Sequence, residues 1–221
     1  MKIAEYVWQD DKIINVVVLK HSETSKLGDD LLIATYHFSV DQFFNFRNDK
    51  ENCLDCPYSY NAGNGKCYTH KGNLRFGLSN MIRRLSKLNI TEFNNEKWNE
   101  FLNICTAFKT KFIRFGVYGE PIFLTIKQIE DLTHNKKWSG YTHQWFNKHE
   151  YKKYFMASVH TSDEGTIAEN MGWRFFMAGK EESKRSVNCP ASKEAGKKSN
   201  CQTCVLCNGF NSKKHIWIAQ H

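Results

Sequence analysis

The sequence has little proline and no long hydrophobic run. It contains 3 prolines among 221 residues, and Pro57 and Pro190 each follow a cysteine directly. An uncharged apolar run of about 18 residues, which a membrane-spanning helix needs, is absent. The first residues, MKIAEYVWQDD, carry acids where an export signal needs an apolar stretch. We therefore expect a cytoplasmic protein that has no membrane partner.

Several common catalytic patterns are also missing. The glycine-rich fingerprints of P-loop and Rossmann proteins are absent, and the sequence shows no Ser-His-Asp or Cys-His nucleophile arrangement. Disorder is excluded for most of the chain, because 41% hydrophobic and 14% aromatic residues are ample for a buried core. The formal charge of +8 permits a nucleic-acid partner but does not require one.

The apolar pattern begins with strands and then alternates between strands and helices. The β-branched and aromatic stretches Ile13–Lys20 and Leu31–Phe38 predict two strands. Apolar residues at helical spacing predict helices over Leu74–Leu88 and Asn94–Phe108. The strands expected beyond residue 111 are 112–117, 138–144, 154–160, 173–178 and 215–219, and the helices are 126–133, capped by Thr125, and 162–171, capped by Ser162.

Alternating strands and helices imply parallel strands joined by crossover helices. We expect one α/β domain over residues 1–221, built as an open parallel sheet or an incomplete (β/α) barrel with cysteine-rich metal-binding loops. In both architectures functional residues gather at the C-terminal ends of the strands. Glu120, His143 and His160 lie at the C-terminal ends of expected strands and are the candidates for lining a pocket.

The eight cysteines carry the clearest chemical signal. A reducing compartment disfavours disulfides and favours the binding of a metal or a cluster. Cys105 lies on the apolar face of its helix and is expected in the core. The other cysteines fall in two segments with few large apolar residues, at about 49–73 and 188–214, which metal binding would help to order.

The C-terminal group reads Cys189-x11-Cys201-x2-Cys204-x2-Cys207. Three thiolates at intervals of three residues can surround one inorganic centre, and a fourth, followed by Pro190, arrives from a distance. This pattern is typical of bacterial iron–sulfur ligation, in which a C-x2-C-x2-C run is completed by a remote Cys-Pro. It favours a [4Fe-4S] cluster over tetrahedral zinc, which more often uses two separated C-x2-C pairs.

The N-terminal group reads Cys53-x2-Cys56-x10-Cys67-x2-His70. With His70 included, two pairs of ligands separated by a loop make a zinc pattern. Without His70, three thiolates would hold a cluster with one open coordination position, where a substrate or cofactor could bind. The sequence leaves both interpretations open, together with a third in which the cysteines are reduced and bind nothing.

Several stretches resemble an uncharacterised cysteine-rich family carried mainly by bacteriophages and related mobile elements. They are Arg114–Pro121, Gly140–Trp145 with Met156–Val159, Gly172–Phe176 with Asn188–Gly196, Cys201–Gly209 and Ile216–His221. The resemblance covers roughly residues 50–221. It implies a phage-type protein in the cytoplasm of the host cell, with a host protein as a candidate partner, but it implies no activity.

A second, looser similarity is to radical S-adenosylmethionine proteins. Those proteins use an incomplete α/β barrel, a three-cysteine [4Fe-4S] cluster in an early loop and a Gly-Glu turn that binds the amine of the cofactor. Cys53, Cys56 and Cys67 and the turn Tyr118–Glu120 stand in the matching order, although the family's usual spacing is C-x3-C-x2-C. The similarity implies S-adenosylmethionine as a cofactor bound by Tyr118, Gly119 and Glu120.

These observations predict an iron–sulfur protein with a [4Fe-4S] cluster on the C-terminal group. A second metal centre is expected on the N-terminal group, with radical or redox chemistry as its candidate activity. The alternative is a zinc-stabilised protein that binds nucleic acid or a host protein without catalysis.

Overall fold

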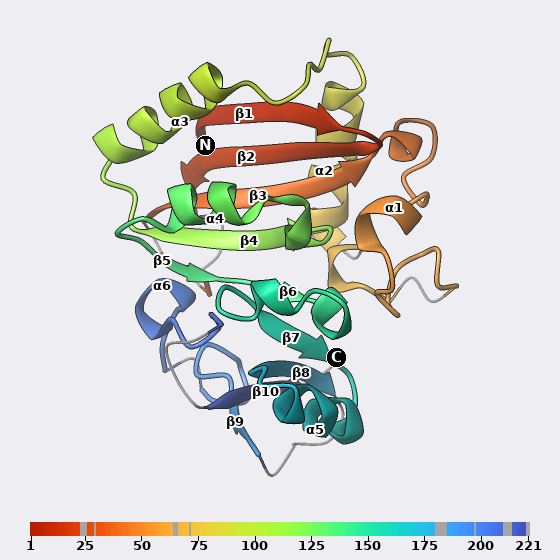
Figure 1. Cartoon of the computed structure of the whole chain (residues 1–221), viewed down its shortest axis with the longest axis vertical. Coiled ribbons are helices and arrows are strands. Elements are labelled where there is room, and N and C mark those ends of the chain that lie inside the picture. The colour runs from red at the N-terminus through yellow and green to blue at the C-terminus, as the bar shows by residue number, and fades with distance from the viewer. Residues whose placement is uncertain are drawn as a thin grey trace.

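The computed structural model describes residues 1–22, 26–28, 30–63, 66–70, 72–179, 185–196, 198–209 and 214–219. Figure 1 shows the strands β1 to β8 following one another down the molecule. The strands are β1 (Lys2–Asp10), β2 (Ile13–His21), β3 (Leu31–Ser39), β4 (Phe112–Tyr118), β5 (Lys137–Ser139), β6 (Tyr141–Thr142), β7 (Met156–Val159), β8 (Phe175–Gly179), β9 (Ser186–Asn188) and β10 (His215–Ala219). The α-helices are α1 (Lys50–Cys53), α2 (Gly72–Leu85), α3 (Asn95–Ala107), α4 (Ile126–Thr133), α5 (Ser162–Asn170) and α6 (Cys201–Cys204). Short 3-10 turns are η1 (Val40–Phe43), η2 (Tyr68–His70), η3 (Pro121–Phe123), η4 (Gln144–Phe146) and η5 (His149–Tyr151).

The first sheet has five strands in the order β1-β2-β3-β4-β5. β1, β2 and β3 pair in antiparallel fashion, whereas β3, β4 and β5 pair in parallel. β2 lies inside this sheet and is buried on both faces, with Val16 and Val18 on one side and Val17 and Leu19 on the other. This explains its continuous run of β-branched and aliphatic residues.

The second sheet also has five strands, in the order β6-β7-β8-β10-β9, and every pairing in it is parallel. The two sheets meet at Gly140, between β5 and β6. A Cβ atom at Gly140 would lie 2.8 Å from the Phe155 ring and 2.9 Å from Phe115, so only glycine fits this junction without a shift. The parallel strands follow chain order from β3 to β5 in the first sheet and from β6 to β8 in the second, where β10 lies between β8 and the edge strand β9.

The two faces of the sheets are covered differently. One face packs against α3, α4 and α5 through a core that spans both sheets and includes Trp98, Ile129 and Phe175. The opposite face packs against α2 and carries cysteines of both groups, because Cys53 and Cys56 lie among its apolar residues beside β2–β4 and Cys189 lies beside β7 and β10. We call this second side the cysteine face.

The α/β architecture with parallel-rich sheets is as expected, but several boundaries differ. The expected strand 138–144 is divided at Gly140, because the Gly140 N–H donates to the carbonyl oxygen of Cys207, 2.9 Å away, instead of to a strand. Strand β1 was not predicted, and it pairs with β2 over its whole length. The N-cap of α5 is Thr161 rather than Ser162, since the Thr161 hydroxyl accepts from the Glu164 N–H.

Candidate metal centres and the adjoining polar site

Consecutive parallel strands deliver the predicted pocket residues to one place. The N-terminal cysteine loop follows β3, Glu120 follows β4, His143 follows β6 and His160 follows β7. Because the C-terminal ends of parallel strands meet at one edge, these residues converge although they are far apart in the sequence. The structure therefore brings all three pocket candidates together beside the N-terminal cysteines.

Glu120 and His143 form the best-defined polar contact of this edge. The Glu120 carboxylate is almost fully buried, and one oxygen lies 2.6 Å from Nδ1 of His143. The same carboxylate accepts hydrogen bonds from the Thr142 hydroxyl at 2.7 Å and from the His143 N–H at 3.2 Å. Burial alone would lower the pKa of His143, but the Glu120 carboxylate and a hydrogen bond to Cys56 outweigh it and raise that pKa well above its ordinary value.

His160 lies on the far side of His143. The two imidazole rings are stacked with centroids 5.3 Å apart, and the Tyr58 ring meets His160 edge-on at 4.5 Å. Burial, together with the charge of His143, lowers the pKa of His160 to about 4. His160 is therefore neutral at physiological pH, and neither of its ring nitrogens has a hydrogen-bond partner among the described residues.

The three N-terminal thiols are gathered next to this pair. Burial raises the pKa of the Cys53 thiol well above its usual value, and the nearby Asp49 carboxylate and the Cys56 and Cys67 thiols raise it further. Burial also raises the pKa of Cys67, although a hydrogen bond with the Thr69 hydroxyl at 3.0 Å opposes the rise. Without a bound cation both thiols stay protonated, so metal binding would release protons.

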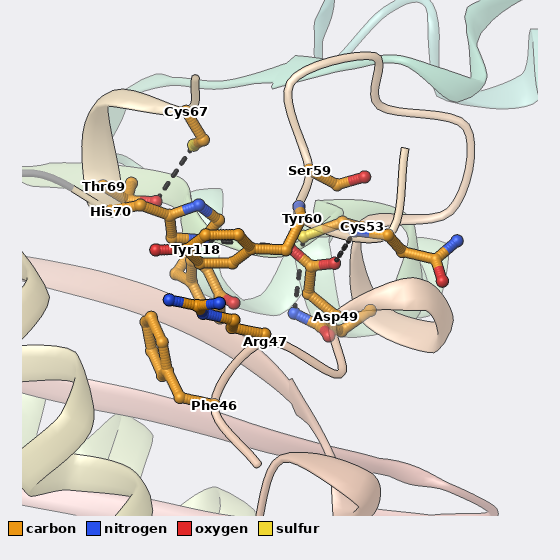
Figure 2. A network of polar contacts seen from close by, with 12 residues as sticks. Phe46, Arg47, Asp49, Cys53, Ser59, Tyr60, Cys67, Thr69, His70 and Tyr118 are labelled. Atoms are coloured by element: carbon orange, nitrogen blue, oxygen red, sulfur yellow. Dashed lines mark hydrogen bonds and ion pairs between the residues drawn. The ribbon is translucent and has the colours of Figure 1, made fainter. Parts of the chain in front are cut away.

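Asp49 organises the loop that carries these thiols. Its carboxylate accepts the N–H groups of Tyr60 and Asn61 at 2.8 and 2.9 Å. Figure 2 shows Asp49 beside Tyr60. The carboxylate is buried, and by accepting these two N–H groups it fixes the backbone between Cys56 and Cys67. The sequence does not reveal this role, since a lone Asp before a short helix carries no distinctive pattern.

His70, the predicted fourth ligand, is placed in an aromatic pocket. Its ring stacks on Tyr60 with centroids 4.1 Å apart and meets the edges of Phe46 and Tyr118 (Figure 2). Its Nε2 lies 3.8 Å from the Asp49 carboxylate. Burial lowers the pKa of His70, so the ring is neutral and packs as an aromatic residue.

The turn after β4 is built closely against β3. Gly119 has φ +76°, and a Cβ atom there would lie only 2.4 Å from the His37 carbonyl oxygen. Tyr118 points into the cysteine face, where its hydroxyl accepts a hydrogen bond from Gln42 at 2.7 Å. The Glu120 N–H donates to the Asn52 carbonyl oxygen at 2.8 Å, which fastens the turn to the cysteine loop.

The C-terminal cysteines approach one another from three segments. Cys189 follows β9, and Cys201 and Cys204 are the first and last residues of α6. Cys207 lies beyond α6, and its carbonyl oxygen accepts the hydrogen bond from the Gly140 N–H. Burial raises the pKa of Cys201. The charges of Arg114 and Lys26 lower that pKa, while Cys189 and Cys204 raise it further. Burial raises the pKa of Cys207 to about 12, although a hydrogen bond with Tyr141 opposes the rise.

Two arginines support this C-terminal group. The Arg174 side chain is buried and donates to the carbonyl oxygens of Leu206, Asn208 and Lys214, which holds the segment that carries Cys207. The Arg114 guanidinium lies over the Tyr141 ring at 4.9 Å and donates to its hydroxyl at 3.1 Å. Arg114 thus places a positive charge beside the thiols, a role that its position within a strand did not reveal.

The thiols of each group lie near one another, but they do not surround a common point at which a metal could sit. Among the described residues, no group of three or more His, Cys, Asp or Glu side chains is arranged to hold a metal ion as it stands. Binding would have to draw the sulfur atoms together, as is usual for cysteine sites that order on metal uptake. Cys105 was expected in the core and is fully buried there.

The other surfaces give little evidence about partners. Several lysines lie close in sequence to the C-terminal cysteines. Lys193 and Lys198 are exposed, whereas Lys197 and Lys213 lie outside the described residues. Across the described ranges, no helix combines the length and the apolar character needed to cross a membrane. Comparisons with protein-family models, curated proteins and solved structures find no match, so function is inferred from the site's own residues.

Proposed function

We propose that this chain is a metal-binding protein with a [4Fe-4S] cluster on Cys189, Cys201, Cys204 and Cys207. The convergence of these thiols from three segments of the cysteine face carries the proposal. A donor set of four thiolates suits an iron–sulfur cluster, and the positive Arg114 beside it would offset the negative charge of such a cluster.

The proposal includes a second metal centre on Cys53, Cys56 and Cys67. It is supported by the mutual proximity of the three thiols and by their place at the C-terminal ends of parallel strands. With the three thiolates as its only ligands, this centre would keep an open position for redox or radical chemistry, and Glu120, His143 and His160 would line the space around a bound substrate. S-adenosylmethionine binding by Glu120 would require that carboxylate to give up its bonds to Thr142 and His143.

The strand order supports an incomplete barrel as the architecture. β3, β4 and β5, and then β6, β7 and β8, are parallel neighbours in chain order, as in a (β/α) barrel, while β10 and β9 exchange places at the end. The crossover helices α4 and α5 both pack on the face opposite the cysteines, whereas α2, which connects β3 to β4 together with α3, packs on the cysteine face. In such a barrel the cysteine face would be the inner surface.

The test is anaerobic purification followed by a visible spectrum and by iron, sulfide and zinc analysis of one sample. A brown protein with about four irons or more per chain is the expected result. Cys204→Ser should bleach the C-terminal cluster. Cys105→Ala is the matched control, because Cys105 is buried in the opposite core and its loss should leave the colour unchanged.

Two outcomes would contradict the iron–sulfur proposal. An unchanged spectrum and melting temperature in Cys204→Ser would rule out the proposed cluster on the C-terminal cysteines. A colourless protein with about two zinc ions per chain would instead make both centres structural staples. Binding to single-stranded nucleic acid and to host proteins would then be measured, and nucleic-acid affinity should fall steeply with salt.

A further inference from the structure

Three contacts join the segments that follow β4, β6 and β7 to the N-terminal cysteine loop. The Glu120 N–H donates to the Asn52 carbonyl oxygen at 2.8 Å, directly before Cys53. The Gln144 side-chain amide donates to Asp55 at 3.2 Å, directly before Cys56. The Tyr58 ring contacts His160, which stacks on His143. These contacts come from separate strands, and together they fix His143 above the segment that carries the first two thiols.

The orientation of the His143 ring is set by Glu120. Nδ1 lies 2.6 Å from the carboxylate, so this nitrogen carries the proton and donates it to the hydrogen bond. Nε2 is the nitrogen left for a metal, and a metal bound there would displace any proton that it carries. A carboxylate that fixes the tautomer of an imidazole in this way is the usual outer partner of a metal-bound histidine. Glu120 is itself fixed by the Thr142 hydroxyl.

His70 has none of these features. Its ring is stacked on Tyr60, and the nearest carboxylate, that of Asp49, already accepts two backbone N–H groups of the loop. Moving His70 toward the thiols would break the stack and open the pocket formed by Phe46 and Tyr118. The His143 side chain already interacts with Cys56 and Cys67, so only the thiols would have to be drawn together for it to join them around a metal.

We infer that His143 is the fourth donor of the N-terminal centre and that Glu120 positions it. The inference rests on the proposed function, since it takes Cys53, Cys56 and Cys67 as metal ligands. The resulting donor set, three thiolates and one imidazole, matches tetrahedral zinc in a closed structural site. It replaces His70 as the ligand and fills the position that an open iron would leave for a cofactor.

Zinc is the probe for the test. The full chain is reduced, freed of metal and titrated with Zn2+ against a chromophoric chelator, and bound metal is counted per chain. His143→Ala should lose about one zinc relative to wild type, whereas His70→Ala and His160→Ala should keep it. Glu120→Gln should weaken that zinc by about 10–100-fold. Folding of each variant is checked by circular dichroism.

His143→Cys separates ligation from a packing role. A thiolate can replace the imidazole as a donor, so this variant should recover the lost zinc, and its Co2+ form should show stronger thiolate-to-cobalt absorption than wild type. A packing role would not predict that recovery. Loss of zinc in His70→Ala or His160→Ala but not in His143→Ala would overturn the inference. If His143→Ala also kept its zinc, a three-thiolate centre would remain and only the inference would fail. If wild type bound no metal at this loop, the proposed second centre would fail with it.

Discussion

At the scale of single residues, Gly119 has little room for a side chain. Gly119 and Gly63 both have a positive φ, +76° and +74°, but a Cβ atom would clash with the His37 backbone at the first and meet no atom of the described residues within 4 Å at the second. Substitution of either glycine by Ala should lower the free energy of unfolding by about 1–2 kcal/mol, because the left-handed backbone conformation strains a residue that has a Cβ atom.

Gly119→Ala should lower the free energy of unfolding by about 1–3 kcal/mol more than Gly63→Ala, because the turn must also move away from β3. Urea denaturation of both variants measures the difference. Equal losses would mean that the turn shifts freely, and would argue against a rigid placement of Glu120.

His37 makes the stability of the folded chain depend on pH, and one substitution can isolate this contribution. Its ring is fully buried with Nδ1 2.7 Å from the Asn15 side-chain oxygen, and burial lowers its pKa to about 3. The unfolded chain takes up a proton near the ordinary pKa of about 6.5, so stability is lost as pH falls below that value and toward 3.

Between pH 7.5 and 5 this one residue should cost wild type about 2 kcal/mol. His37→Gln cannot titrate and should lack that part of the loss, while the cysteines contribute equally to both proteins. Urea denaturation of the two proteins at both pH values tests this. Parallel pH profiles for wild type and variant would show that His37 becomes protonated in the folded chain.

At the scale of elements, the Arg174 side chain is what ties the C-terminal cysteine segment to β8. It donates to carbonyl oxygens of three residues in that segment while itself buried. Arg174→Gln should therefore lower the free energy of unfolding by at least about 2 kcal/mol, since hydrogen bonds from a charged donor are lost.

The same variant should release metal from the C-terminal centre faster than wild type in a chelator challenge. Arg185→Gln is the control, because Arg185 is exposed and its ion pair with Glu169 is worth about 1 kcal/mol or less. Identical release rates for Arg174→Gln and wild type would show that the cysteines hold their segment without this clamp.

The elements also show how far a sequence can be followed into structure. Helices α3 and α4 were predicted nearly to the residue, because Asn94 and Thr125 are side-chain caps with the apolar periodicity behind them. β1 escaped prediction because Glu5, Gln9 and Asp10 interrupt its apolar positions, and its pairing with β2 supplies the stability that the local sequence does not.

The sequence named candidate residues for this edge but did not predict the contacts among them. Glu120, His143 and His160 were singled out because each lies at the end of an expected strand, which is a local property. That His143 rather than His70 stands by the thiols depends on the order of the parallel strands, which brings β6 beside the loop after β3. The sequence spacing favoured His70 because local spacing carries no information about strands that meet only in the folded chain.

At the scale of the whole molecule, the sheets have a core of their own and the cysteine segments do not. The largest group of buried side chains joins both sheets to α3, α4 and α5 on the face away from most of the cysteines. Metal removal should therefore lower the melting temperature and expose the cysteine loops to protease while most secondary structure survives. Circular dichroism and limited proteolysis before and after chelation test this, and complete unfolding on chelation would contradict it.

The Gly140 junction links the two proposed centres through one hydrogen bond and a short stretch of backbone. The Gly140 N–H donates to the Cys207 carbonyl oxygen, and from Gly140 the chain runs through β6, Tyr141–Thr142, to His143. A displacement of Cys207 when its centre fills would pass through this hydrogen bond and the backbone of β6 to the proposed donor of the other centre. We expect cooperative loading, in which each filled centre changes the affinity of the other by the same factor, as linkage requires. Titration of one centre with the other filled or disabled would measure that factor, which would be unity if the junction is rigid.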